Sequence, residues 1–197
     1  MIWFKKHHIR RRAYLTVGSI FALMAPLSLA SKAPENQKQI GQADFEKWQK
    51  FHSVPGKCKI SFPEAPEHMH QTMSLDNESN DLKYDVYVAA QEKEAVYMVL
   101  IAQYPPFVDD TYAELSLESF LNGILKQNPQ NQLIFADLVE VQGYKGLDFF
   151  IRSKGVYFKG RAVMAKNNLY LLAMECEMNK YKENHFDYFI NSFEILK

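Results

Sequence analysis

His68 and His70 are the residues whose type and spacing most directly suggest chemistry, because two imidazoles one residue apart could share a metal ion. Alternate side chains of a strand point to the same face, so both rings would be presented together. A metal site needs further ligands, and Glu67 and His52 are candidates to supply them. Because no further ligand stands at a recognisable spacing, the pattern favours solvent-exposed strand histidines. We expect neither a metal nor a cofactor.

Cys58 and Cys176 are the only two cysteines, and they lie 118 positions apart. In an exported protein, oxidising conditions would permit a disulfide between them, worth about 4–5 kcal/mol through loop-closure entropy. Each cysteine also stands among apolar residues typical of a strand, where buried free thiols are common. The sequence leaves both alternatives open.

Local catalytic signatures are missing from the sequence, which has no Gly-x-Ser-x-Gly, His-Glu-x-x-His or Cys-x-x-Cys. The run from Gly155 to Gly160 superficially resembles a phosphate loop, but the Lys and Ser or Thr that open the following helix are absent. We expect an ordinary strand here, with two side chains in the core and three exposed: Val156 and Phe158 inside, Tyr157, Lys159 and Arg161 outside. We therefore do not expect an enzyme, although a site assembled from dispersed residues is an alternative.

A loop with Phe107, Asp109 and Asp110 follows the pair Pro105-Pro106. Acidic loops are commonly just solvated, but loops carried on a rigid scaffold are also where recognition residues concentrate. These three residues are therefore candidates for contact with a protein partner.

Hydrophobic periodicity predicts the elements that position these residues. Strand patterns occupy 57–62, 84–88, 95–104, 132–142, 144–153, 156–166 and 169–177, and 95–104 is apolar on both faces, as in a central strand. Helical spacing predicts one helix over 111–128, with a capping box from Thr111 to Glu114, and a second over 179–192, capped by Asn179. Short turns at Gly143, at Lys154-Gly155 and at Asn167-Asn168 favour antiparallel neighbours. The expected fold class is α+β, a central antiparallel sheet flanked by helices.

The first thirty residues are typical of an export signal. Five basic residues and no acid precede an apolar stretch over 13–30, which ends in the small residues Ser28 and Ala30. We expect cleavage after Ala30; an uncleaved anchor is the alternative, because 18 apolar residues approach the length of a membrane span. The twin arginines Arg11-Arg12 leave the secretion route open. The expected location is the periplasm or the cell exterior.

The neutral formal charge of the chain conceals an acidic folded part. Residues 1–30 hold five of the 23 Lys and Arg, so residues 31–197 carry 18 basic against 23 acidic side chains. Nucleic acids and anionic lipids recognise basic surfaces, so neither is expected as the main partner. The membrane would be contacted only through the N-terminal segment. The expected organisation is a signal peptide at 1–30, a polar leader at 31–51 and one domain at 52–197.

The chain resembles the PsbP, Mog1p and DcrB-like group over roughly 52–196. The residues that carry the resemblance are Val54-Pro55-Gly56, Phe62-Pro63 with Pro66, Gly143-Tyr144-Lys145-Gly146 and the ending Phe189 to Phe193. Members of this group are accessory or binding proteins, and the resemblance implies their antiparallel sheet with helices. It carries no binding residue onto this chain. We expect an exported, non-enzymatic interaction domain with an unknown protein partner in the envelope; a ligand-binding or hydrolytic domain is the alternative.

Overall fold

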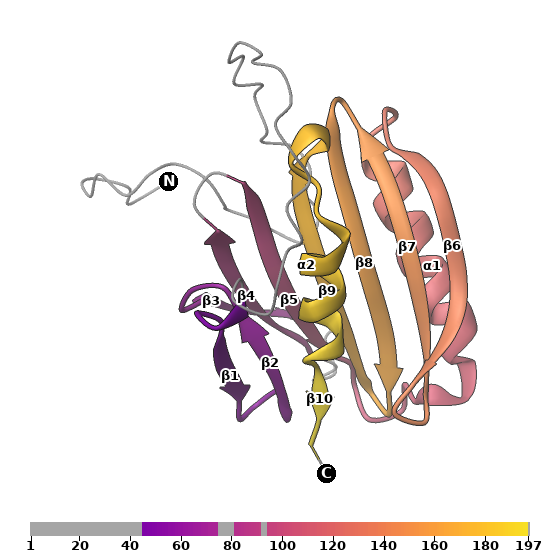
Figure 1. Ribbon diagram of the computed structural model, residues 1–197. Coiled ribbons are helices and arrows are strands. Elements are labelled where there is room, and N and C mark those ends of the chain that lie inside the picture. Colours follow the sequence, from indigo (N-terminus) through magenta and orange to yellow (C-terminus); the bar gives the residue numbers. More distant parts are fainter. Residues whose placement is uncertain (1–44, 75–80, 92–93, 197) are drawn as a thin grey trace, which may run out of the picture.

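The structure is a computed structural model that describes residues 45–74, 81–91 and 94–196. The expected signal peptide, its cleavage point after Ala30 and most of the expected leader lie outside these ranges. The described residues form a seven-stranded sheet in the order β3-β4-β5-β9-β8-β7-β6 and a three-stranded sheet in the order β1-β2-β10 (Figure 1). None of the helices within these ranges is long and apolar enough to cross a membrane.

The elements have the following bounds. The strands are β1 (Gln49–Ser53), β2 (Cys58–Phe62), β3 (Glu67–Ser74), β4 (Asp81–Gln91), β5 (Ala95–Gln103), β6 (Gln132–Val141), β7 (Tyr144–Ser153), β8 (Val156–Ala165), β9 (Asn168–Glu177) and β10 (Glu194–Ile195). The helices are α1 (Ala113–Gln127) and α2 (Glu183–Asn191), each preceded by a short 3-10 turn, η2 (Asp110–Tyr112) and η3 (Met178–Lys180).

The strands β6 to β9 form the meander that the short turns predict, with antiparallel pairing throughout. Gly143 and Gly155 adopt the left-handed conformation expected of turn glycines, with φ of 84° and 81°. The last turn differs from the prediction, because the positive φ of 54° falls on Lys166 and not on the asparagines. Asn167 instead donates a side-chain hydrogen bond of 2.7 Å to the carbonyl of Tyr104, which ties this turn to the end of β5.

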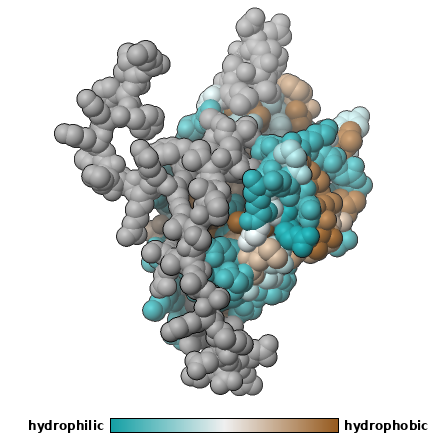
Figure 2. All heavy atoms as spheres, turned by 90° about the horizontal axis from the view of Figure 1, so that it is seen from above, coloured by the Kyte–Doolittle hydropathy of each residue, from teal (hydrophilic) through white to brown (hydrophobic). Residues whose placement is uncertain are grey.

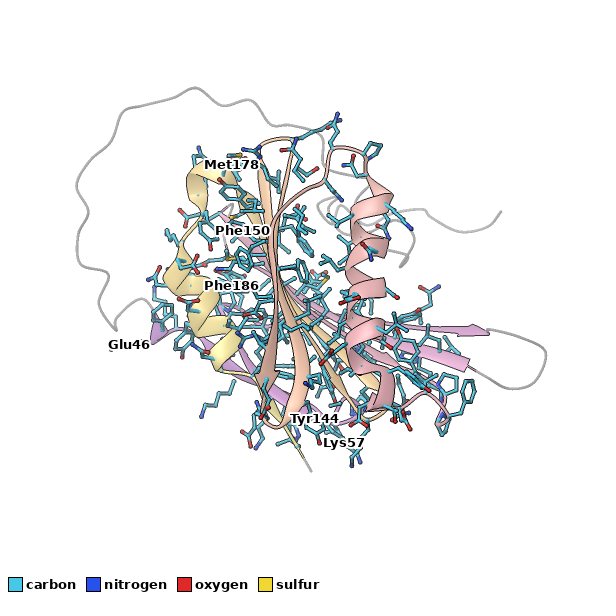
Figure 3. All side chains as sticks on the ribbon, turned by 90° about the vertical axis from the view of Figure 1, so that its right-hand side faces the viewer. Glu46, Lys57, Tyr144, Phe150, Met178 and Phe186 are labelled. Carbon is cyan, nitrogen blue, oxygen red and sulfur yellow. The ribbon has the colours of Figure 1, made fainter. Side chains whose placement is uncertain are left out.

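The strand β5 is central, as its two apolar faces predict. It lies between β4 and β9, and six consecutive residues from Tyr97 to Ala102 are buried. One face of the large sheet packs against α1, which buries Leu117, Leu121 and Ile124 against β7 and β8. The opposite face packs against α2 and the small sheet. Figure 3 shows the two helices on opposite sides of the strands.

On one face of the large sheet, the three-stranded sheet packs beside α2. The molecule is therefore richer in sheet than the expected sheet flanked by helices. It is a mostly antiparallel sheet structure with two helices. Both helices also begin later than predicted. Asp109 caps η2 by accepting a hydrogen bond from the Thr111 backbone N–H, so the box from Thr111 to Glu114 does not start α1. The segment around Asn179 forms η3, and α2 starts at Glu183.

The folded part starts earlier than the boundary near His52 that the sequence suggests. Trp48 is 9% exposed, and its ring meets Tyr97 edge-on at 5.1 Å between centroids. Phe45 stacks on Tyr188 of α2 at 4.2 Å. The sequence predicts a leader here because its aromatic residues are scattered in a polar stretch. Packing of these rings against the core attaches residues 45–51 to the domain.

Candidate functional site

The loop that joins β5 to α1 presents its apolar side chains outward on a firmly held backbone. The backbone N–H of Val108 donates to the carbonyl of Pro105 at 2.9 Å, which closes a turn. Pro105 is buried and Val108 packs against the core, whereas Phe107, between them, is 70% exposed. Anchored ends with an exposed ring at the turn give a rigid projection.

Two further large apolar side chains lie just beyond this turn. Tyr112 is 69% exposed and Leu115 is 62% exposed. Tyr112 directly precedes α1 and Leu115 lies three residues later, a spacing that makes side chains neighbours on a helix surface. With Phe107, Asp109 and Asp110 they form what we call the β5–α1 surface.

Acidic groups surround these apolar residues. The hydrogen bonds that Asp109 accepts from the side chain and backbone of Thr111 hold the pKa of this carboxyl below its usual value, so it stays charged at neutral pH. Asp110 and Glu114 are also exposed. Lys145 forms an ion pair with Glu114 at 3.0 Å, and this pairing raises the pKa of the Lys145 ammonium.

The structure thus places the predicted contact residues Phe107, Asp109 and Asp110 in one short, exposed stretch. Sequence analysis missed Tyr112 and Leu115. A signal for Leu115 was present, because it falls outside the stripe of Leu117, Leu121 and Ile124 that faces the sheet.

His68 and His70 project to the same face of β3, as predicted, but they converge on a carboxylate. Both contact Oδ1 of Asp85, His68 through Nε2 at 2.7 Å and His70 through Nδ1 at 3.1 Å. The ring of His68 also stacks on Tyr87 at 4.4 Å. The ranges that the structure describes contain no group of three or more His, Cys, Asp or Glu residues that could hold a metal ion. The histidine pair acts here as an exposed partner of Asp85.

Cys58 and Cys176 are both free and buried, so the disulfide alternative is not realised. The hydroxyl of Tyr170 in β9 donates a hydrogen bond to the carbonyl of Gly56, two residues before Cys58. Cys176 lies six residues after Tyr170 along the same strand. Six strand residues span roughly 20 Å, and a disulfide needs Cα atoms within about 7 Å. Burial raises the pKa of Cys58 to about 12 and that of Cys176 to about 11, so both thiols stay protonated and unreactive.

Lys159 is buried, contrary to the exposed position that strand alternation suggested. Its ammonium contacts the hydroxyl of Tyr181 at 3.1 Å and pairs with Glu183. Four aromatic rings surround it at 4.7–5.9 Å from their centroids: Phe186, Phe150, Tyr181 and Phe135. Figure 3 shows Phe150 and Phe186 on the α2 side of the sheet. Alternation did place Lys159 on the face opposite Phe158, but that face is covered by the start of α2.

One neighbouring residue of β8 also differs from the prediction. Arg161 is only partly exposed and forms a bidentate ion pair with Asp148 at 2.6 and 2.7 Å. Gly160 is a mid-strand residue, and a Cβ there would lie 2.5 Å from the ring of Phe149. This glycine therefore makes room for an aromatic ring and is not part of a phosphate loop.

A second exposed apolar strip runs along β6, an end strand of the large sheet. Leu133, Ile134 and Leu138 are 43%, 49% and 51% exposed. Seen from above, hydrophobic atoms appear on the right-hand side of the molecule, where Figure 1 places β6 (Figure 2). The pairing with β7 shifts register between Leu133 and Phe135, and Asp137 is exposed beyond the shift. A bulge and a charge are features that protect a sheet edge from adding further strands.

Comparisons with known proteins found similar solved structures but no family model and no curated relative. The chain is similar to the solution structure of cyanobacterial PsbP (CyanoP) from Synechocystis, at 13% identity with a TM-score of 0.48, over 80% of this chain and 98% of that one. It is also similar to a crystal structure from Bacteroides thetaiotaomicron, at 15% identity with a TM-score of 0.39, over 77% of this chain and 49% of that one.

Proposed function

We propose that this chain is an exported, non-enzymatic interaction domain that docks a protein partner through the β5–α1 surface. The observation that carries the proposal is the exposure of Phe107, Tyr112 and Leu115, each above 60%, within nine residues. Single exposed apolar residues are normal on a protein surface, but a close group of them is typical of an interaction site.

The chemistry of the group supports protein binding. Aromatic side chains dominate the energetics of protein interfaces, and they do so best when held rigidly before binding. Phe107 satisfies this condition because the closed turn from Pro105 to Val108 fixes its backbone. Each of these side chains that becomes fully buried in a partner would contribute about 1.5–3 kcal/mol to the free energy of binding through the loss of exposed apolar surface.

The charges around the group specify the partner further. Asp109 and Asp110 give the surface a negative rim, whereas the charge of Glu114 is paired with Lys145. A protein that presents an apolar hollow bordered by Lys or Arg would match both the apolar and the acidic components. Association should accordingly be faster at low ionic strength than at high ionic strength.

The experiment compares three tagged forms of the full chain, produced in its native host and isolated with what they bind from the envelope. The test form is the triple variant Phe107→Ser, Tyr112→Ser and Leu115→Ser. The control is Val54→Ser, which removes an apolar side chain that is 73% exposed elsewhere. We expect at least one protein that the wild type and the control retain and the triple variant loses by roughly tenfold or more. Retention of every bound protein by the triple variant would refute the β5–α1 surface as the docking site.

Export is the second component of the proposal, and it is supported by the sequence of residues 1–30. Sequencing the mature N-terminus from fractionated cells tests it independently. We expect the mature chain to begin at Ser31 and to lie outside the cytoplasm. A cytoplasmic product beginning at Met1 would exclude export.

A further inference from the structure

A hollow of about 560 Å³ lies on the outer side of the β1–β2 hairpin, against the end of α2. In the register of the hairpin, Lys50 is opposite Ser61 and His52 is opposite Lys59. Cross-strand pairs share a face, so all four side chains belong to the outer face, away from the core that Phe51 and Ile60 enter. The volume lies within the range of about 300–1,000 Å³ that is usual for small-ligand sites.

The hairpin is the basic region of an acidic domain. Residues 49–62 contain Lys50, Lys57 and Lys59 and no acidic residue. The remainder of residues 31–197 is strongly acidic, because the whole stretch holds 18 basic against 23 acidic side chains. The net charge of the hairpin is therefore opposite in sign to that of the rest of the domain.

The cations that line the hollow are unengaged. Within the residues that the structure describes, no ion pair or hydrogen bond involves the ammonium of Lys50 or of Lys59. Lysines that line the same hollow repel each other, and an anion between them would relieve that repulsion. Glu194 lies on the rim opposite Lys59 and offsets one of the positive charges. The hollow stays net positive, because Lys50 and Lys59 outnumber that single carboxylate.

The other side of the hollow offers a wall that suits an organic group. Tyr188 and Asn191 line it from α2, and Ser192 secures that wall by accepting a hydrogen bond from the backbone N–H of Ser61 at 2.9 Å. Tyr188 is itself held in place by its stack on Phe45. The result is a fixed aromatic side chain beside two free ammonium groups.

We propose that this hollow binds a phosphate monoester, with the phosphate between Lys50 and Lys59 and the organic part against Tyr188. His52 and the Asn191 side-chain amide supply further hydrogen-bond donors to the phosphate oxygens. This site is distinct from the β5–α1 surface and does not depend on the interaction proposed there. The phosphate can belong to a free small molecule or to a lipid headgroup, since both present the same chemistry.

The test uses the purified full chain and two probes, phenyl phosphate and vesicles that contain phosphatidic acid in phosphatidylcholine. Binding of phenyl phosphate is measured by titration calorimetry at low salt, with inorganic phosphate as a comparison. We expect phenyl phosphate to bind more tightly than inorganic phosphate, and both to weaken as salt is added. The double variant Lys50→Gln/Lys59→Gln should weaken binding by about tenfold or more, whereas Lys126→Gln, a distant exposed lysine in α1, should not change it.

The variants distinguish every outcome. Sedimentation with acidic vesicles but not with pure phosphatidylcholine, lost in the double variant, identifies a lipid headgroup as the source; phenyl phosphate binding without sedimentation identifies a free ligand. Binding of neither probe, undiminished binding in the double variant, or equal loss in Lys126→Gln overturns the site. A thermal unfolding curve unchanged in the double variant shows that folding is intact. The triple variant of the β5–α1 surface should bind both probes like the wild type, so the two proposals fail separately.

Discussion

The helix α1 and the residue before it carry apolar side chains on two surfaces, one buried and the other exposed. Leu117, Leu121 and Ile124 are at most 6% exposed and pack against the large sheet. Leu115, two residues before Leu117, is 62% exposed, and its neighbour Tyr112 is 69% exposed. Only the first group contributes to folding through burial. The second gives no stability to the isolated domain, and it belongs to the surface that we propose docks a partner.

The largest effect expected from this comparison is on the buried side. Leu117 has no exposed surface, so Leu117→Ala should lower the free energy of unfolding by about 2–5 kcal/mol through lost burial and a cavity. Urea denaturation followed by circular dichroism measures it. A loss below about 1 kcal/mol would mean that α1 is less firmly packed than the structure shows.

The pH dependence of stability tests how apolar the surroundings of Glu175 are. This residue lies opposite Phe158 of the α1-side core, and burial raises its pKa from 4.5 to about 7. The folded state therefore holds this proton more tightly than the unfolded state, and stability should fall as pH rises from about 4.5 to about 7. Glu175→Gln should remove that decline and stabilise the domain by about 1–3 kcal/mol at pH 8. The same stability difference between the two proteins at every pH would contradict the desolvation of this half-buried carboxyl.

Lys159 extends the comparison to the opposite face of the sheet, where a cation is buried among aromatic rings. Its side chain is 10% exposed. Lys159→Ala should cost about 1–2 kcal/mol, because both the packed stem and the cation–π contacts are lost. Lys159→Met keeps most of the stem and serves as the control in the same denaturation experiment. Equal stability of the wild type and the Ala variant would show that the aromatic surround contributes nothing.

The smallest effect on stability is expected at the exposed apolar residues. Leu115→Ala should change the free energy of unfolding by no more than about 0.5 kcal/mol, although it removes the same atoms as Leu117→Ala. Thermal unfolding of the two variants side by side makes the comparison. A large loss in Leu115→Ala would assign this side chain to the fold and remove its role in docking.

Much of the architecture could be predicted from periodicity. The alternation Cys58, Ile60, Phe62 identified β2, the doubly apolar segment identified the central β5, and short turns identified the meander of β6 to β9. These patterns are local and follow from burial on one or two faces. The start of the domain was harder, because Phe45 and Trp48 are scattered in a polar stretch and are covered by rings distant in the sequence, such as Tyr188 and Tyr97.

The candidate site was only half predictable, for the same reason. The loop residues Phe107, Asp109 and Asp110 could be selected because prolines and acids mark a surface loop. The hollow beside the hairpin could not, since it depends on the approach of Tyr188 and Asn191, more than 120 residues from Lys59. Likewise, alternation predicted which face of β8 Lys159 occupies but not that Phe186 and Tyr181 would cover it.

Site-specific crosslinking tests the docking surface most directly. A photoreactive benzophenone residue is placed at Phe107 in one strain and at Val54, which is similarly exposed, in another, and both are irradiated in intact cells. We predict that Phe107 gives a discrete crosslinked partner that Val54 does not give, and that Asp109→Asn/Asp110→Asn weakens the band. No crosslink at Phe107, or the same crosslinks at both positions, would contradict a partner at the β5–α1 surface.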